Sequence, residues 1–180
     1  PRNEVEETLV EIWKSVLGVE RAGIDDDFFE LGGESVLAAC VVAEIEKYFG
    51  KRLPLSAFVD RVTIADLARL IYLPVDESAW SPLVGLQTRG SRPPFFCVHP
   101  IGGHVLSYRL LAQHLGQGQP FYGLQAYGLD DREPPLLRIE EMAARHVAAI
   151  RSVQPHGPYY LGGYSFGGSV ALEIAQQLQA

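Results

Sequence analysis

The sequence predicts two folded units of different class: an all-α bundle of four helices, then part of an α/β fold with a parallel sheet and flanking helices. Residues 1–73 place apolar side chains at helical spacing and show no strand pattern. Residues 74–92 lose this periodicity and contain prolines and glycines, which is typical of a linker. From residue 93 to residue 180, short apolar runs alternate with helical segments, and this alternation favours a parallel sheet.

The first unit, residues 1–73, contains three helical segments, expected at residues 5–17, 37–49 and 63–71. A glycine directly follows each of the first two segments, as is common after helix C-termini. The spacing of a capping box precedes the first and the third segment, at Asn3 with Glu6 and at Thr63 with Asp66. We therefore expect a small bundle that folds independently of the rest of the chain.

The second unit, residues 93–180, alternates candidate strands with candidate helices. In chain order, these strands and helices are expected at residues 95–99, 107–115, 120–125, 139–153, 159–161 and 167–178. The residues before the unit, 74–92, are expected to form the linker.

The composition restricts the classes of partner. The formal net charge is −7, and residues 1–73 contain eight Lys and Arg against fourteen Asp and Glu. An acidic unit repels nucleic acid and anionic membranes, and it suits a basic protein partner. No apolar run approaches the roughly 18 residues that suggest a membrane span. Cys40 and Cys97 lie in separate apolar runs without metal-ligand spacing, so we expect buried thiols in a cytoplasmic protein.

Ser35 lies where a glycine-containing loop meets the second predicted helix. Gly32 and Gly33 allow the backbone to turn just before it. The unpaired N–H groups and the dipole of a helix N-terminus favour an anionic group, so a phosphodiester on this hydroxyl is compatible with the position. The local pattern also allows a simpler interpretation, in which Ser35 is only an N-cap.

Residues 28–35, Phe-Phe-Glu-Leu-Gly-Gly-Glu-Ser, resemble the D-x-F-F-x-L-G-G-x-S signature of peptidyl carrier proteins in nonribosomal peptide synthetases. The resemblance extends over the whole first unit. It implies that a phosphopantetheinyl transferase attaches 4′-phosphopantetheine to Ser35, and that the arm holds an acyl or peptidyl thioester. The implied partners are upstream adenylation or condensation domains. Glu34 stands where the family often has His or Asp, which bears on partner preference.

Ser165 is the centre of the pentapeptide Gly163-Tyr164-Ser165-Phe166-Gly167, a G-x-S-x-G pattern between a predicted strand and a predicted helix. A nucleophilic serine at such a sharp turn adopts strained backbone angles, and the small flanking residues let strand and helix pass closely. The alternative is a glycine-rich turn with a surface serine. The strand–turn–helix context favours the nucleophile.

An oxyanion hole needs two N–H donors, and the first candidate is the backbone of Phe166. Residues 98–103 resemble the loop of type I thioesterases from peptide and polyketide synthases, in which the residue after the proline donates. That resemblance implies Ile101 as the second donor. His99 and His104 precede Ser165, so we expect them to shape the loop. The remaining histidines are expected to be structural or solvated: His114, His146 and His156.

No His or Asp follows Ser165, and Glu173 is the only later carboxylate. The resemblance implies the N-terminal part of an α/β-hydrolase thioesterase domain, with its triad Asp and His beyond residue 180. We therefore expect an active serine thioesterase in the intact parent and a nearly inactive chain by itself. Two alternatives remain: a carrier or docking module with a passive hydrolase fragment, and catalysis completed by a second chain. Fluorophosphonate labelling of Ser165 in the isolated chain would exclude the passive fragment.

Overall fold

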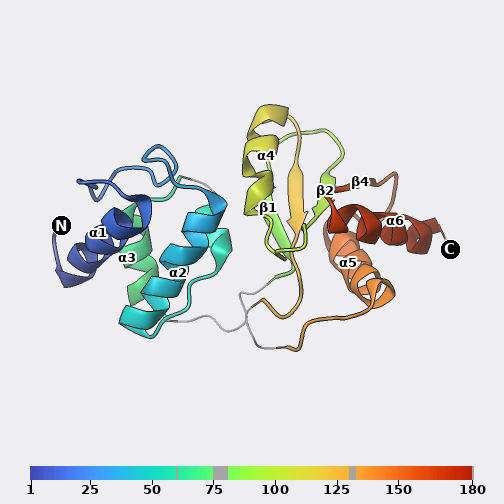
Figure 1. Ribbon diagram of the computed structural model, residues 1–180. Helices are drawn as coiled ribbons and strands as arrows, with labels where there is room; N and C mark the ends of the chain where they lie inside the picture. The colour runs from blue at the N-terminus through green and yellow to red at the C-terminus, as the bar shows by residue number, and fades with distance from the viewer. Residues whose placement is uncertain (60, 75–80, 130–132, 180) are drawn as a thin grey trace. The chain divides into compact units, whose positions relative to one another are not determined.

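The computed structural model describes residues 1–59, 61–74, 81–129 and 133–179. The chain divides into two compact units, Pro1–Trp80 and Ser81–Ala180, which are described separately (Figure 1). Residues 75–80 of the predicted linker lie outside the described residues. Within the described part of the chain, none of the helices combines the length and apolar character needed to cross a bilayer.

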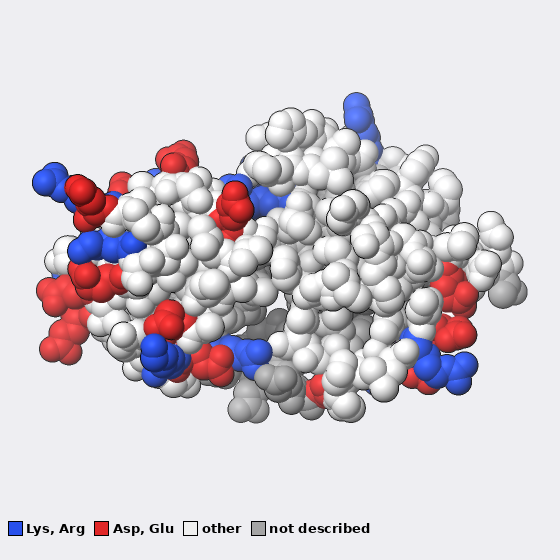
Figure 2. Space-filling view, viewed as in Figure 1, with Lys and Arg blue, Asp and Glu red and all other residues white. Residues whose placement is uncertain are grey.

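The first unit is helical, as predicted. Its elements are α1 (Glu4–Leu17), α2 (Ser35–Phe49), η1 (Leu55–Phe58) and α3 (Ile64–Tyr72). The fourth helix of the predicted bundle is thus a short 3-10 helix. On the face of this unit visible in Figure 2, acidic side chains outnumber basic ones, in agreement with the charge of its sequence.

The two predicted capping boxes have different outcomes. Thr63 and Asp66 form the full box, in which each side chain accepts a hydrogen bond from the other residue's backbone N–H. Asn3 accepts from the Glu6 N–H at 2.9 Å, but the Glu6 carboxylate binds the backbone N–H and guanidinium of Arg2 instead. The predicted capping box at α1 is therefore only half formed, because the Glu6 carboxylate binds the charged Arg2 side chain instead of the Asn3 backbone N–H.

The core of the first unit is centred on the aromatic ring of Phe28. Its ring centroid lies 5.1 Å from that of Trp13 and 5.2 Å from that of Phe58, both in edge-to-face geometry. All three side chains are fully buried. Since Phe28 belongs to the loop before α2, the loop that leads to Ser35 is packed as part of the core.

The Asp27 carboxylate connects this loop to the segment before α3. It is buried, and its oxygens accept hydrogen bonds from the backbone N–H groups of Phe29 at 2.9 Å, Glu30 at 3.1 Å and Val62 at 3.1 Å. These bonds satisfy amides that helices and strands do not pair.

We expect Asp27→Ala to lower the free energy of unfolding of the first unit by about 3 kcal/mol, because three backbone donors lose their acceptor. Hydrogen exchange of α1 amides measures this change. Asp26→Ala is the matched control, since Asp26 is exposed and accepts a single backbone N–H, and we expect it to cost less than about 1 kcal/mol. Equal losses in the two variants would contradict the structural role of Asp27.

The second unit is a four-stranded sheet with helices packed against it. Its elements are β1 (Leu83–Gln87), β2 (Phe95–Val98), η2 (Leu106–Tyr108), α4 (Arg109–Leu115), β3 (Phe121–Leu124), α5 (Ile139–Val153), β4 (Tyr160–Gly163) and α6 (Phe166–Gln179). The strand order is β1-β3-β2-β4. Strands β2, β3 and β4 are parallel, as predicted.

Strand β1 corrects the sequence analysis, which placed the whole of residues 74–92 in a linker. Leu83 pairs with Leu124, and Val84 with Gly123, so that β1 lies antiparallel to β3. The sheet is therefore mixed, and the second unit begins before residue 93. The five residues of β1 around Gly85 have little strand character of their own, and their pairing with a distant strand makes them part of the sheet.

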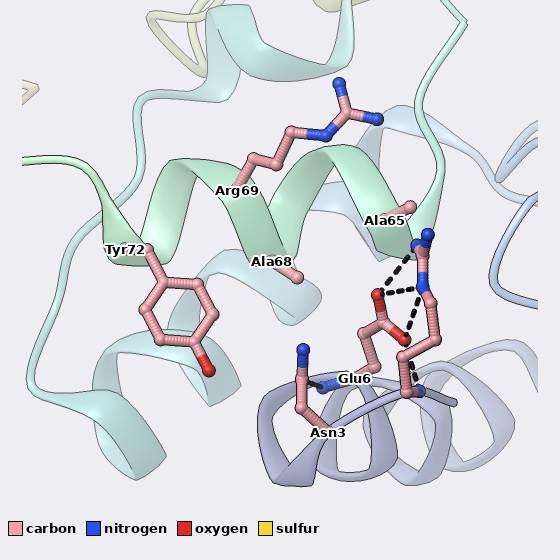
Figure 3. Close-up of a pocket in the computed structure, with 7 residues that line it drawn as sticks. Asn3, Glu6, Ala65, Ala68, Arg69 and Tyr72 are labelled. Carbon is pink, nitrogen blue, oxygen red and sulfur yellow. Dashed lines mark hydrogen bonds and ion pairs between the residues drawn. The ribbon is translucent and has the colours of Figure 1, made fainter.

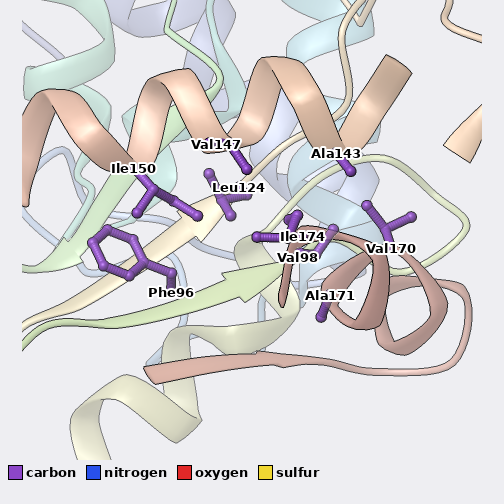
Figure 4. Close-up of a cluster of buried hydrophobic side chains, with 9 residues drawn as sticks. All are labelled: Phe96, Val98, Leu124, Ala143, Val147, Ile150, Val170, Ala171 and Ile174. Carbon is purple, nitrogen blue, oxygen red and sulfur yellow. The ribbon is translucent and has the colours of Figure 1, made fainter. Parts of the chain in front are cut away.

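The main core of the second unit lies between the sheet and the helices α5 and α6 (Figure 4). Its buried members from the strands are Phe96, Val98 and Leu124, and those from the two helices are Ala143, Val147, Ile150, Val170, Ala171 and Ile174. Because β2, β3 and β4 are parallel, their carboxyl ends meet at one edge of the sheet. The loops that follow those strands therefore converge there, which is where ligand sites of α/β sheets form.

Candidate functional site

Ser35 is the first residue of α2, and the N-cap position belongs to Glu34. The interpretation of Ser35 as a simple N-cap does not fit this arrangement. Within the described residues, the Ser35 hydroxyl makes no hydrogen bond, and the side chain is partly exposed. The hydroxyl is therefore not held by a hydrogen bond within the described part of the chain.

Gly32 and Gly33, which precede Ser35 by three and two residues, are favoured at their positions for different structural reasons. Gly32 has a φ of 92°, which favours glycine. A Cβ on Gly33 would lie 2.4 Å from the Phe28 ring and 2.5 Å from the Phe28 carbonyl oxygen. The Gly33 N–H donates to that carbonyl at 2.9 Å. The close approach to the buried Phe28 thus fixes where α2 begins.

The N-terminus of α2 is suited to a phosphodiester. The hydrogen-bond ladder of α2 begins with the Ala38 N–H, which donates to the carbonyl of the N-cap residue Glu34 at 2.8 Å. The preceding N–H groups are left without helical acceptors. No acidic residue occupies the first turn of α2. Unpaired donors and the positive end of the helix dipole both favour an anionic group on Ser35.

Ser165 occupies a strained turn between β4 and α6. It has a φ of 56°, and among the described residues it is the only non-glycine residue with positive φ. A Cβ on Gly163 would lie 2.3 Å from backbone atoms of Gly167. A Cβ on Gly167 would lie 2.3 Å from the Val98 carbonyl oxygen at the end of β2. Both glycines of the pentapeptide are therefore required by backbone contacts, and Ser165 is exposed between them.

The loop after β2 brings the second proposed oxyanion donor to the same edge of the sheet. Ile101 is 80% exposed, and neither its backbone N–H nor that of Phe166 donates to an acceptor in the described part of the chain. The Pro100 carbonyl fixes the loop by accepting from the Gly103 N–H at 2.9 Å and from His99 Nδ1 at 2.7 Å. The loop thus has a defined shape, and the Ile101 N–H is left without an acceptor in the described part of the chain.

Neither His99 nor His104 hydrogen-bonds the Ser165 hydroxyl in the described part of the chain. The His99 ring is buried, and its centroid lies 5.9 Å from that of Phe166. Burial lowers the pKa of both histidines. Among the described residues no side chain hydrogen-bonds the Ser165 hydroxyl, and Glu173 accepts from Gln177 on the same helix. Among the residues that the structure describes, no base and carboxylate are therefore hydrogen-bonded in series with Ser165.

His146, for which the sequence predicts a structural or solvated role, is fully buried on α5. Neither of its ring nitrogens has a hydrogen-bond partner among the described residues. Its ring centroid lies 6.1 Å from that of His99 and 5.6 Å from that of Tyr127. Burial, and secondarily the neighbouring His99, lower its pKa from 6.5 to about 3. The imidazole is therefore neutral in the folded unit.

This buried imidazole predicts an acid-labile second unit. The unfolded chain takes up a proton at His146 near pH 6.5, whereas the folded unit does so only near pH 3. The contribution to stability is thus complete above pH 6.5 and falls by about 1.4 kcal/mol per pH unit below it. Between pH 6.5 and pH 5, protonation of His146 should lower the free energy of unfolding of the second unit, measured with urea, by about 2 kcal/mol.

A variant pair isolates the effect of His146. His146→Phe removes the titrating ring, so its stability should depend less steeply on pH than that of the wild type. His156→Gln is the control, because His156 is exposed, and its pH dependence should equal that of the wild type. An unchanged slope in His146→Phe would show that this group does not cause the acid lability.

Tyr108 is the functional candidate that the sequence analysis missed. It was predicted only as part of a helical segment, and no local motif distinguishes it. In the structure it is buried and contacts both the end of β2 and the turn before Ser165. Only the tertiary arrangement brings these segments to one hydroxyl.

The first unit also has a surface groove of about 290 Å³, formed by α1, α3 and the residues before α1 (Figure 3). Arg2, Glu6 and Tyr72 are among its lining residues, and Ser35 is not. The ion pair of Arg2 with Glu6 spans part of it, with a separation of 2.8 Å. The groove is thus separate from the serine that the sequence motif identifies.

Comparison with known proteins finds a matching family model for each unit. Residues 7–71 match the model of phosphopantetheine attachment sites, and residues 93–180 match that of thioesterase domains. The chain is 42% identical over 179 residues to a dimodular nonribosomal peptide synthase of Bacillus subtilis (strain 168), and 42% identical over 179 residues to an indigoidine synthase of Dickeya dadantii (strain 3937). Both alignments cover 99% of this chain, but only 8% and 12% of the relatives.

A solved structure gives the same result for both units. The crystal structure of holo-AB3403, a four-domain nonribosomal peptide synthetase bound to AMP and glycine, matches 99% of this chain with 37% identity and a TM-score of 0.57. The match covers 14% of that protein. The chain therefore spans a small part of the length of the proteins to which it is similar.

Proposed function

The chain belongs to the nonribosomal peptide synthetases, with a phosphopantetheine carrier domain before thioesterase-domain residues, and from this premise we propose one linked function. Ser35 accepts a 4′-phosphopantetheine arm, and Ser165 takes over the acyl or peptidyl group held on it. Release follows by hydrolysis or by attack of a nucleophile within the product. The observation that supports this best is the strained turn of Ser165 between two glycines that cannot bear a side chain.

The carrier half rests on the accessibility of Ser35 and on the N-terminus of α2. When bound, the arm supplies a terminal thiol that can hold an acyl group as a thioester. The unpaired N–H groups of α2 favour the phosphodiester, and Gly33 with Phe28 holds the loop that presents the hydroxyl. A phosphopantetheinyl transferase is the proposed modifying partner, and adenylation or condensation domains are the proposed sources of the acyl group.

The release half rests on Ser165 and two backbone donors. Ser165 Oγ adds to the carbonyl carbon of the incoming acyl group as its proton passes to a base. The N–H groups of Ile101 and Phe166 stabilise the negative charge that develops on the carbonyl oxygen. Collapse of the tetrahedral intermediate expels the thiol and leaves an ester on Ser165. Water or an internal nucleophile then cleaves that ester.

A base and an orienting carboxylate must complete this site. In α/β hydrolases they follow the nucleophile in the chain, and no His or Asp follows Ser165 in this sequence. We therefore propose that the chain of 180 residues is by itself nearly inactive, and that further residues of a longer chain supply both groups. Two alternatives are a second chain that supplies them, and a carrier or docking role with a passive second unit.

Transfer between the two serines tests the proposal. A phosphopantetheinyl transferase and an acyl-coenzyme A load Ser35, and mass spectrometry of peptides then locates the acyl group. In a completed domain, where this sequence continues to the full length of a thioesterase domain, we expect an acyl ester on Ser165. It should be absent in Ser165→Ala and present in Ser169→Ala, a nearby exposed serine.

The other outcomes separate the alternatives. An acyl group that leaves Ser35 at the same rate in Ser165→Ala would refute Ser165 as the acceptor. Transfer restored by adding a separate chain with the missing residues would favour the two-chain arrangement. A loaded carrier that is stable in the completed domain would favour the carrier or docking role.

A further inference from the structure

We propose that Tyr108 is a positioning residue for the acyl transfer to Ser165. Its hydroxyl connects the strand end before the Ile101 loop to the residue before the nucleophile, and so holds the two oxyanion donors at a fixed separation. This inference rests on the proposed function of Ser165, which it extends to a residue outside the pentapeptide.

The geometry consists of two hydrogen bonds to one oxygen. The Tyr108 hydroxyl donates to the Val98 carbonyl at 2.7 Å and accepts from the Tyr164 backbone N–H at 2.9 Å. Val98 is the last residue of β2, and the loop with Ile101 begins directly after it. Tyr164 immediately precedes Ser165. One phenol thus joins both halves of the proposed oxyanion hole.

The sheet by itself does not make this connection. The ladder between β2 and β4 ends at the pair of Val98 and Gly163, after which the chain turns toward α6. The Tyr108 hydroxyl bridges the two strand ends at this point and satisfies both backbone groups. Gly167 at the start of α6 approaches the same Val98 carbonyl, so this oxygen is the point at which strand, helix and phenol meet.

Burial keeps the Tyr108 hydroxyl protonated, so that it can both donate and accept a hydrogen bond. Tyr108 is 7% exposed, and burial raises its pKa well above the ordinary value. The neighbouring Cys97 thiol is also buried, which raises its pKa to about 11. Both groups are therefore neutral across the range in which enzymes work, and Tyr108 acts by holding the backbone rather than by transferring a proton.

The connection itself can be measured in this chain. Tyr108→Phe removes one oxygen and leaves the ring in place. We expect the Tyr164 amide to exchange its hydrogen at least tenfold faster, with unchanged protection in α5. Tyr159→Phe is the matched control, because it loses one hydrogen bond, to the Pro155 carbonyl, at the opposite end of β4. Unchanged exchange at Tyr164 in Tyr108→Phe would overturn the proposal.

The catalytic consequence is measured in the completed domain. A small displacement of catalytic groups can cost about 100-fold, so we expect Tyr108→Phe to lower kcat by 10- to 100-fold with KM unchanged. A merely structural role would lower the melting temperature and leave kcat per folded molecule intact, and that result overturns the inference. Should Tyr108→Phe fail to fold, 3,5-difluorotyrosine at position 108 keeps the hydroxyl but weakens it as an acceptor. A fall in kcat then supports the role, and an unchanged kcat overturns it.

Ser165→Ala separates this inference from the function on which it rests. If Ser165→Ala abolishes turnover while Tyr108→Phe retains the wild-type kcat, only the role of Tyr108 is wrong. If Ser165→Ala retains turnover, the proposed function is wrong and the catalytic role of Tyr108 is overturned with it.

Discussion

A phosphopantetheinyl transferase with coenzyme A is expected to add one arm to this chain, and the Ser35→Ala variant is expected to take up none. The reason is geometric as well as chemical. Ser35 begins α2 with a hydroxyl that has no hydrogen-bond partner among the described residues, beside N–H groups that have no helical acceptor. Intact-protein mass spectrometry measures the added mass. We expect the mass of one arm on the wild type and no added mass on the variant.

A serine substitution elsewhere in the first unit controls for a general effect of replacing serine. Ser15 is exposed on α1 of the same unit, so Ser15→Ala should be loaded like the wild type. Modification that survives Ser35→Ala would refute the assignment of the attachment site. Loss of modification in both variants would point instead to a damaged first unit, which circular dichroism of the helices would reveal.

The second large effect concerns hydrolysis of a small soluble acyl thioester. The isolated chain is expected to hydrolyse it barely above background, and Ser165→Ala should change that rate little. A serine without a positioned base is a poor nucleophile, and the described residues offer no such base to Ser165. In the completed domain we expect robust turnover, which Ser165→Ala lowers by about 10⁴-fold or more.

The control for this experiment is Ser169→Ala, which removes an exposed hydroxyl four residues later on α6. It should keep the turnover of the completed domain. Robust turnover by the purified, monomeric chain of 180 residues, abolished by Ser165→Ala, would contradict the prediction. The base would then lie among this chain's own residues, and His99 and His104 would be the first to replace.

Helices were the elements that the sequence predicted best. The apolar period of residues 139–153 predicts the bounds of α5 as the structure has them. Such periodicity is local, because side chains three and four residues apart share one face whatever the rest of the chain does. Strand β1 was missed because its identity depends on pairing with β3, which follows it by more than thirty residues.

Ser35 and Ser165 could both be proposed from sequence because their settings are made by adjacent residues. A strained turn between a strand and a helix needs glycines at fixed offsets, and the pentapeptide around Ser165 contains them. Asp27, His146 and Tyr108 gave no comparable signal. The importance of His146 comes from its burial, and that of Asp27 and Tyr108 comes from burial and from hydrogen bonds to residues distant in the chain.

The sequence by itself determined the two fold classes and the position of the helices, and it singled out two candidate serines, because periodicity and short motifs operate over a few neighbouring residues. Only the tertiary structure decided the strand order β1-β3-β2-β4, the buried neutral state of His146 and the bridge from Val98 through Tyr108 to Tyr164. Each of these depends on groups far apart in the chain. A hydrogen bond or a burial cost acts through space, and a linear pattern does not record which groups the fold brings together.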